Sequence, residues 1–437
     1  MAKEEIKKII ESEKVKFLQL WFTDILGAVK SFTIPAHEVG RALDGETTLD
    51  GSSIIGFTPI ENSDMMIQVD PESFRLLPWK DGEHKTAMMF GEILNSDGSV
   101  YADSNRAIFK KVLDEAKSMG FEFFAGPEAE YFYFNSTDKS IIDTAGYFES
   151  LPTDLGEVTR EKTVNALEKL GIAIECAHHE VAPSQHEIDM RYDQGLKMAE
   201  KVLVYKMAVK EIARQDGLIA SFMPKPIAGE NGSGMHTHQS LFKGGENIFF
   251  DASDAGHLSA TAKYYIAGLL KHAPAITAIC NQYVNSYKRL VPGYEAPVYV
   301  AWARKNRSAM IRVPAYKEGK DKSMRIELRS PDPLCNPYLA FAVMLAAGLD
   351  GIKNKYELPA PVEENIYKMD DAKRDSLGIK SLPGSLKDAL SELEKDEVIK
   401  SVLGPSVYAK FVKIKIKEWD EYRMQVDKME VEKYLNV

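Results

Sequence analysis

The stretch GPEAEYFYF, Gly126–Phe134, reads as a buried β-strand that carries two glutamates. Glu128 and Glu130 stand two residues apart, a spacing that places both carboxylates on one face of a strand. In this interpretation Phe132 and Phe134 lie on the same face. The sequence therefore predicts a strand that directs two negative charges toward one point among apolar neighbours.

Two further strand-like stretches, GMHTHQSL and MRIELRS, place chargeable side chains on one face in the same way. A half-solvated antiparallel sheet gives such alternation without binding anything. A solvated face is usually rich in Lys, Thr and Ser, however, whereas these faces carry Glu, His and Arg. Taken together, the three stretches favour a binding site. The alternating residues are His236, His238, Ser240, Arg325, Glu327 and Arg329.

Further acidic residues lie in IECAHHEVAPSQHEID, which supplies Glu175, Glu180 and Glu187 in one strand-turn-strand unit. Glutamates that converge repel one another unless cations compensate them. Carboxylates with one imidazole and no thiolate suit Mg²⁺ or Mn²⁺ better than structural zinc. His178 and His179 point opposite ways on a strand, so at most one could face this site, and we leave both out of it.

Positive charge is supplied by arginines in the C-terminal half of the chain. Isolated arginines are mostly surface residues. Arginines that share a basin with divalent metals are instead suited to phosphoryl transfer. The chain has no Walker A sequence, and GENGSGMH does not open a helix, so phosphate binding would depend on metals and arginines. The arginines are Arg289, Arg307, Arg312, Arg325 and Arg329.

Composition narrows the class of protein. The chain has 437 residues and a formal net charge of -10, which argues against a nucleic-acid surface. Three scattered cysteines without a CxxC predict reduced thiols and a cytoplasmic location. The N-terminus lacks the apolar core of a signal peptide. The longest apolar run, 339–349, is too short to span a bilayer and is interpreted as a core helix, so we expect no membrane partner.

The order of elements predicts an α+β protein with two domains. Residues 15–34 read as a hairpin, followed by a helical stretch at 37–43, a loop and two strands at 65–70 and 85–93. We place the boundary in NSDGSVYADS, giving domains 1–102 and 103–437. In the second domain several strands follow each other through short links, which favours a mainly antiparallel sheet with helices behind it.

With these motifs in order, the chain resembles glutamine synthetases of the bacterial and archaeal class I type, in the shorter subclass that is not adenylylated. The resemblance covers nearly the whole chain. It rests on TLDGSSIIGF, GPEAEYFYF, HHEVAPSQHEID, NGSGMHTHQSL, RLVPGYEAP, RKNRSAMIRVP and RIELRSPDP.

The resemblance implies an N-terminal β-grasp domain and a catalytic domain whose curved antiparallel sheet lines a funnel. It implies a homo-oligomer, a dodecamer of two hexameric rings, in which Asp50 and Ser53 of one subunit complete the site of its neighbour. The implied reaction joins ammonium to L-glutamate through a γ-glutamyl phosphate and consumes ATP. A small regulatory protein, 2-oxoglutarate and glutamine are possible regulators.

The resemblance also assigns the site residues. Two to three Mg²⁺ or Mn²⁺ ions would bind each site, one on Glu130, Glu180 and Glu187, and a second on Glu128, His236 and Glu327. Asp50 would take a proton from ammonium, and Glu295 would close over the intermediate. The nucleotide residues would be Glu175, Tyr192, His238, Ser240, Arg312, Lys322 and Arg325. The glutamate residues would be Asn231, Gly232, Arg289, Glu295, Arg307 and Arg329, of which Arg307 and Arg329 hold the transferring phosphoryl group.

Two alternatives stay open at this point. A relative that joins glutamate to an organic amine would share most of these motifs, although Asp50, Ser53 and Glu180 favour ammonium. A catalytically inactive homologue would be expected to lose metal ligands, whereas all six positions are filled here.

Overall fold

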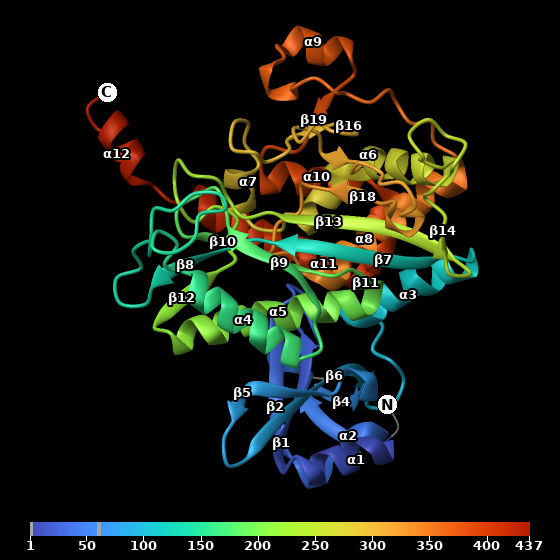
Figure 1. Cartoon of the computed structure of the whole chain (residues 1–437), viewed down its shortest axis with the longest axis vertical. Helices are drawn as coiled ribbons and strands as arrows, with labels where there is room; N and C mark the ends of the chain where they lie inside the picture. The colour runs from blue at the N-terminus through green and yellow to red at the C-terminus, as the bar shows by residue number, and fades with distance from the viewer. Residues whose placement is uncertain (1–2, 59–62) are drawn as a thin grey trace.

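The computed structural model describes residues 3–58 and 63–437, which form a small N-terminal unit below a larger one (Figure 1). The N-terminal unit is built on a six-stranded sheet in the order β2-β1-β6-β4-β3, with β5 paired to β6. The predicted hairpin is confirmed as antiparallel β1 and β2. The bounds are α1 (Lys3–Ser12), β1 (Val15–Thr23), β2 (Val29–Pro35), α2 (Val39–Asp44), β3 (Thr47–Asp50), β4 (Asp64–Val69), β5 (Arg75–Asp81) and β6 (Lys85–Asn95).

Two of these strands differ from the sequence prediction. Strand β3 lies in the segment interpreted as a loop, and β5 was not predicted. The four residues of β3 run directly into Gly51, and β5 contains Pro78, which cannot donate to a strand ladder. Both strands have only one partner, so the signals that mark a central strand are missing from them.

The larger unit contains the predicted, mainly antiparallel sheet. Seven strands follow the order β11-β7-β13-β18-β17-β16, with β14 paired to β13. Only the contact between β16 and β17 is parallel among the pairings described for this sheet. The bounds are β7 (Glu122–Ala129), β11 (Asp193–Gln194), β13 (Met235–Lys243), β14 (Glu246–Asn247), β16 (Trp302–Ala303), β17 (Ile311–Arg312) and β18 (Ile326–Leu328).

A second sheet, in the order β12-β8-β10-β9, adjoins the first and corrects the prediction of one continuous strand at 126–134. Strand β7 ends at Ala129 and β8 begins at Tyr131, in a different sheet. Glu130 is the single residue between them, and Phe132 is fully buried. The two glutamates therefore do not share one strand face. The bounds are β8 (Tyr131–Asn135), β9 (Ile174–His179), β10 (Gln185–Met190) and β12 (Leu218–Ser221).

Helices cover the sheets, and the predicted core helix is confirmed as α8, which is buried along most of its length. It packs so closely on α6 that a Cβ atom on Gly268 would stand 2.1 Å from the carbonyl oxygen of Ala347. None of the described helices is long and apolar enough to cross a membrane. The remaining bounds are α3 (Asn105–Ser118), α4 (Glu157–Lys169), α5 (Gly195–Gln215), α6 (Ala260–Cys280), α7 (Ser286–Arg289), β15 (Tyr299–Val300), α8 (Pro337–Asn354), α9 (Asp371–Ser376), β19 (Lys380–Ser381), α10 (Leu386–Lys395), α11 (Glu397–Arg423) and α12 (Lys428–Tyr434).

The two units are joined by a buried arginine. Arg106 in α3 donates to Asp70 and Glu92 of the N-terminal unit and to Glu200 in α5, at 2.5, 2.9 and 2.9 Å. A buried guanidinium with three carboxylate partners has a fixed orientation because each N–H group points at a different acceptor. Arg106 therefore fixes how the N-terminal sheet is held against α3 and α5.

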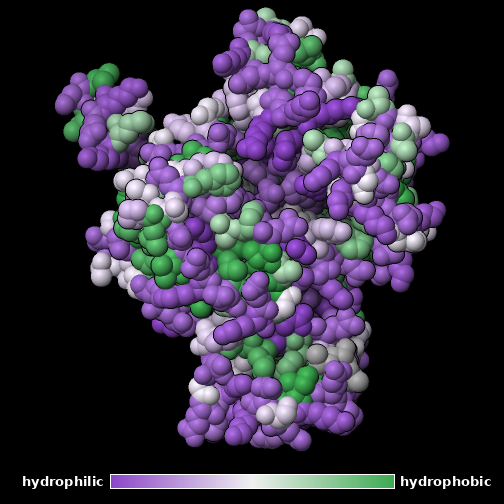
Figure 2. All heavy atoms as spheres, in the orientation of Figure 1, coloured by the Kyte–Doolittle hydropathy of each residue, from purple (hydrophilic) through white to green (hydrophobic). Residues whose placement is uncertain are grey.

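The C-terminal helix α12 stands away from the rest of the chain (Figures 1 and 2). Its apolar side chains and that of the next residue, Leu435, are largely exposed, and Figure 2 shows green atoms among the purple ones there. Met429 is 59% exposed and Leu435 is 73% exposed. An isolated helix of 7 residues is too short to be stable by itself in water, so this arrangement suits a segment that packs on another surface.

Candidate active site

A cavity of about 330 Å³ opens in the larger unit, where the two sheets meet. All six residues predicted to bind metals line it, together with four of the predicted arginines. The structure thus brings together groups that are spread over about two hundred residues of sequence. The predicted residues in the lining are Glu128, Glu130, Glu180, Glu187, Asn231, Gly232, His236, Arg289, Glu295, Arg307, Arg312, Glu327 and Arg329.

Three neighbouring strands supply the first group of predicted ligands, Glu128, His236 and Glu327, which we call the histidine-flanked cluster. His236 in β13 is directly opposite Glu128 in β7. Its Nδ1 atom lies 3.6 Å from Glu128 Oε2 and 3.8 Å from Glu327 Oε1. Sheet register therefore sets the separation of these three groups.

Protein cations compensate the histidine-flanked cluster. Burial favours the protonated form of Glu327, but His238, His236 and the arginines Arg329 and Arg312 outweigh it and lower its pKa. Arg312 Nε donates directly to Glu327, and Arg329 Nη1 lies 3.8 Å from it. The pKa of Glu128 is also lowered, because its hydrogen bonds with the two histidines outweigh burial. Both carboxylates are therefore ionised at neutral pH.

We call the second group, Glu130, Glu180 and Glu187, the acidic cluster. In contrast to the first group, its negative charge is only partly compensated by protein cations. Burial, followed by the charge of Glu180, raises the pKa of Glu130 to about 8. Burial and nearby carboxylates raise the pKa of Glu187 well above its ordinary value. Arg289 lies nearby, but its guanidinium donates to the backbone carbonyls of 329, 330 and 331. Crowded carboxylate oxygens with too little positive charge fit a hard divalent cation.

His178 belongs beside the acidic cluster, and leaving it out of the site was wrong. Its Nδ1 lies 3.6 Å from Glu180 Oε1 and its Nε2 lies 3.7 Å from Glu187 Oε2. The signal was present in the sequence, since His178 and Glu180 are two residues apart on one strand. Its neighbour His179 points the opposite way and is fully buried. Tyr147, Val181, Gln185, Asp189, Tyr294 and Ala296 also line the cavity and were not predicted.

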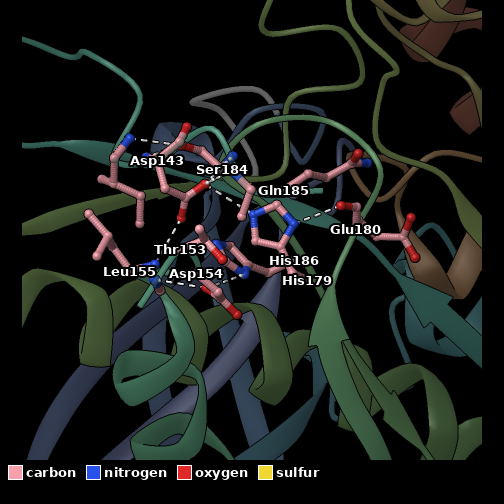
Figure 3. Close-up of polar contacts among 12 residues, drawn as sticks. Asp143, Thr153, Asp154, Leu155, His179, Glu180, Ser184, Gln185 and His186 are labelled. Carbon is pink, nitrogen blue, oxygen red and sulfur yellow. Dashed lines mark hydrogen bonds and ion pairs between the residues drawn. The ribbon is translucent and has the colours of Figure 1, made fainter. Parts of the chain in front are cut away.

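A buried polar network supports the turn that carries Glu180 (Figure 3). His179 Nδ1 donates to the backbone oxygen of Glu180 at 2.7 Å, and its Nε2 donates to Asp143 Oδ1 at 3.1 Å. Asp143 also accepts from the backbone of Ser184 at 3.0 Å. Because both ring nitrogens of His179 donate, the ring is held as a cation that fixes the start of the turn.

The same network has side chains that could bind a metal, but an arginine takes the place of the ion. Asp154 and His186 are fully buried beside Asp143 and His179, so two carboxylates and two imidazoles converge here. Arg160 Nη1 occupies the position of a cation, 2.8 Å from His186 Nδ1 and 2.8 Å from Asp154 Oδ2. The network therefore positions the ligand loop by its own charges.

A loop on the other side of the cavity carries Glu295. This residue has a φ of 57°, in the left-handed region, and Asn231 Nδ2 donates to its Oε2 at 3.3 Å. The adjacent Tyr294 ring lies under Lys225 Nζ, 3.8 Å from the ring centroid. These two contacts hold the loop against the segment that carries Lys225 and Asn231.

Eight predicted residues lie outside the lining of the cavity. Glu175 is exposed and points to the side of β9 opposite to Glu180. Within a single chain it therefore does not join Glu180 and Glu187, and grouping it with them was wrong. His238 is close by, since its Nε2 donates to Glu128 Oε1 at 2.8 Å while its Nδ1 accepts from Arg325 at 3.2 Å. The others are Asp50, Ser53, Tyr192, Ser240, Lys322 and Arg325.

Asp50 and Ser53 lie in the N-terminal unit, at the end of β3. The side-chain and backbone hydrogen bonds of Ser52 lower the pKa of Asp50, and Ser53 adds to the effect. Asp50 is exposed and holds a formal negative charge at neutral pH. Neither residue reaches the cavity of its own chain.

Comparisons with known proteins agree with this arrangement. Residues 102–434 match the family model of the glutamine synthetase catalytic domain, and residues 14–96 match that of the glutamine synthetase beta-Grasp domain. A glutamine synthetase of Staphylococcus aureus is 47% identical over 440 residues, covering 99% of this chain and 98% of the relative. One from Methanosarcina mazei is 46% identical over 441 residues, covering 100% and 98%.

Solved structures show the same fold. A GmaS/ADP complex superposes with a TM-score of 0.90 at 30% identity, covering 99% of both chains. A cryoEM structure of Plasmodium falciparum glutamine synthetase gives a TM-score of 0.88 at 26% identity, covering 99% of this chain and 98% of the other. The chain therefore belongs to the glutamine synthetase family, as an ATP-dependent glutamate–ammonia ligase that makes glutamine with divalent metal ions.

Proposed function

We propose that the cavity is the glutamine synthetase active site and that the two clusters hold Mg²⁺ or Mn²⁺, two to three ions in each site. The observation that carries this proposal is the convergence of six ligands and four arginines on one cavity. The donor set supports it, since oxygen ligands with one imidazole are typical of Mg²⁺ and Mn²⁺. When bound, the metals neutralise the repulsion between the glutamate carboxylate and the ATP γ-phosphate.

The chain's own residues then have separate tasks. A γ-carboxylate oxygen of glutamate attacks the γ-phosphorus of ATP, and the bond to ADP breaks. We assign Arg307 and Arg329 to the transferring phosphoryl group, Arg312 and Arg325 to the other phosphates, and the acidic cluster to the glutamate side. Nucleotide contacts are assigned to Glu175, Tyr192, His238, Ser240 and Lys322, and glutamate contacts to Asn231, Gly232 and Arg289.

The second step needs a neutral amine, because ammonium has no lone pair. Asp50 takes a proton from ammonium, after which the nitrogen attacks the acyl carbon and phosphate leaves. Asp50 and Ser53 reach the site from a neighbouring subunit, which accounts for their distance from the cavity in one chain. Glu295 keeps water from the acyl phosphate, and its contact with Asn231 supports this role.

Glutamine synthetases are oligomers, and we propose a dodecamer of two hexameric rings here. The exposed apolar residues of α12 support the assembly because they need a partner surface. The domain boundary between 102 and 103 remains a proposal, supported by the ranges of the two family matches. A cytoplasmic location is supported by the three free cysteines.

The test is release of phosphate from ATP with every substrate varied in turn. We expect release only when glutamate, ammonium and Mg²⁺ or Mn²⁺ are all present. An equal rate with ethylamine or putrescine in place of ammonium would assign the chain to organic amines instead. The same assay with 2-oxoglutarate, glutamine or a small regulatory protein tests the expected regulators.

The role of Asp50 has its own test. We expect Asp50→Ala to slow glutamine formation by about 10²-fold or more while ATP binding stays unchanged. Asp64→Ala is the matched control, because Asp64 is the exposed partner of Asp50 in the ladder between β3 and β4. Mixing Asp50→Ala subunits with subunits that lack Glu327 should restore some activity if the site is shared between neighbours.

A further inference from the structure

One face of the hairpin formed by β9 and β10 carries a second set of ligands next to the acidic cluster. Cys176 in β9 is directly opposite Asp189 in β10, and His178 is directly opposite Glu187. Cys176 and His178 are two residues apart, so they share a face, as do Glu187 and Asp189. The row of ligands thus continues from the acidic cluster to a thiol.

The thiol, the imidazole and the second carboxylate are already close together. Cys176 Sγ donates to Asp189 Oδ2 at 2.8 Å. Ligand atoms of Cys176, His178 and Asp189 all lie within 4.8 Å of one another. Cys176 is exposed, and all three residues line a groove of about 970 Å³ beside the active-site cavity. An ion from solvent can therefore reach them.

We propose that Cys176, His178 and Asp189 form a binding site for a thiophilic divalent cation such as Zn²⁺. One thiolate, one imidazole and one carboxylate are zinc ligands, and water can complete a tetrahedron. This set differs from both catalytic clusters, which contain no sulfur and suit harder ions. The metal–sulfur bond replaces the S–H bond, and the released proton passes to solvent.

The distances allow this coordination with small side-chain movements. A tetrahedral zinc with bonds of about 2.3 Å to sulfur and about 2.0 Å to nitrogen or oxygen holds its ligand atoms about 3.5 Å apart. Cys176 Sγ and Asp189 Oδ2 are 2.8 Å apart, and all three ligand atoms lie within 4.8 Å of one another, so shifts of about 1 Å are sufficient. Paired backbone positions keep Cys176 and Asp189 opposite each other while the ligand atoms adjust.

A redox role for Cys176 is less well supported than metal binding. Partial desolvation of the sulfur by the surrounding groove, followed by its bond to Asp189 and the charge of that carboxylate, raises the pKa of Cys176 to about 12. A protonated thiol is a poor nucleophile and oxidises slowly. A metal, in contrast, deprotonates a coordinating thiol.

Occupancy of this site would slow catalysis through His178. The same imidazole flanks Glu180 and Glu187, so a cation that takes one of its nitrogens removes a neighbour from the acidic cluster. This consequence rests on the proposed role of those glutamates. The binding of the cation does not depend on that role.

Cobalt substitution tests the site directly, because a thiolate bound to Co²⁺ gives a charge-transfer band that carboxylates cannot produce. The full-length protein is first saturated with Mg²⁺ and then titrated with Co²⁺. We expect one band per chain in the wild type and none in Cys176→Ala, which retains the buried Cys280 and Cys335. Ala177→Ser, on the opposite face of β9, is the matched control and should keep the band.

Two results would overturn the site: no band in the wild type, or a band of equal strength in Cys176→Ala. Asp189→Asn should retain the band but weaken cobalt binding by about tenfold. Phosphate release under saturating Mg²⁺ tests the effect on catalysis. We expect zinc to inhibit the wild type at concentrations about tenfold lower than Cys176→Ala. Equal inhibition of both would disprove the coupling through His178, whereas an inactive wild type would count against the proposed function alone.

Discussion

The two clusters of the active site contain nearly the same ligands but differ in how the protein balances their charge. In the histidine-flanked cluster, His236, Arg312 and Arg329 lower the pKa of Glu327 despite its burial. In the acidic cluster, burial and neighbouring carboxylates raise the pKa of Glu130 to about 8. Protein cations balance the charge of the first cluster, whereas the second has too few of them and holds protons in the absence of a metal.

This difference suggests different affinities and different roles in folding. A cluster with its own cations is pre-organised, so an ion arriving there with ATP changes little in the protein. A cluster of repelling carboxylates gains more from a bound cation, because the ion replaces protons that the site would otherwise hold. We therefore expect the acidic cluster to bind its metal first and more tightly.

Removing a carboxylate from the acidic cluster should have the largest effect. We expect Glu130→Gln to lower the rate of glutamine formation by more than about 10²-fold, because a direct ligand is lost. Above pH 8, where Glu130 is ionised, the same change should raise the melting temperature of the chelator-treated protein, since one source of repulsion disappears. Glu122→Gln, exposed in β7, is the control and should change neither value. A lower melting temperature in Glu130→Gln would contradict the assigned charge balance.

The corresponding change in the histidine-flanked cluster should affect stability in the opposite direction. Glu327→Gln leaves Arg312 without its buried partner, which should cost about 3 kcal/mol of unfolding free energy. Denaturant unfolding of the metal-free protein measures this loss. The exposed Glu318→Gln serves as the control. If Glu327→Gln were as stable as the wild type, the two clusters would not differ in the way described.

The pH dependence of stability should separate the clusters without any substitution. A folded chain that keeps a proton on Glu130 binds more protons than the unfolded chain between pH 4.5 and about 8. The unfolding free energy of the metal-free protein should therefore fall as pH rises through this window, by about 4 to 5 kcal/mol. Saturating Mg²⁺ should remove most of this slope. A slope that is equal with and without metal would mean that the acidic cluster is not the source.

Replacing His178 should give the smallest of these effects. This imidazole flanks Glu180 and Glu187 without a direct hydrogen bond, at 3.6 and 3.7 Å. We expect His178→Gln to raise the Mg²⁺ concentration for half-maximal rate by about tenfold. The maximal rate at saturating Mg²⁺ should stay within about threefold of the wild type. Loss of the maximal rate instead would make His178 a participant in the reaction.

Much of the fold could be predicted because its signals are local. The hairpin of β1 and β2 and the core helix α8 both follow the patterns of their own residues. The break at Glu130 could not be predicted this way, because residues 126–134 alternate as one strand while the partners on either side change. At this break Glu130 accepts hydrogen bonds from Gln185 and Gly234. Both lie in distant segments, so residues 126–134 alone carry no signal for them.

The sequence predicted which residues gather at the cavity better than it predicted how their side chains are arranged. The motifs singled out the residues proposed as metal ligands in both clusters, and the structure gathers these residues in one cavity. Simple alternation on β9 would have included His178 and excluded Glu175, but the glutamates were grouped by sequence proximity. The contact between His238 and Glu128 depends on register between β13 and β7, which no single stretch contains.

Glu130, the single residue between β7 and β8, fixes the distance between the two clusters. Glu128 lies in β7, and Glu130 lies where the chain passes into β8 of the second sheet. No loop separates the two residues, so the backbone cannot absorb a movement between the sheets. With the two clusters in their proposed roles, any sliding of one sheet against the other changes the distance that the phosphoryl group crosses by almost the same amount. An added or deleted residue here would therefore uncouple the two halves of the reaction even if each half still bound its ligands.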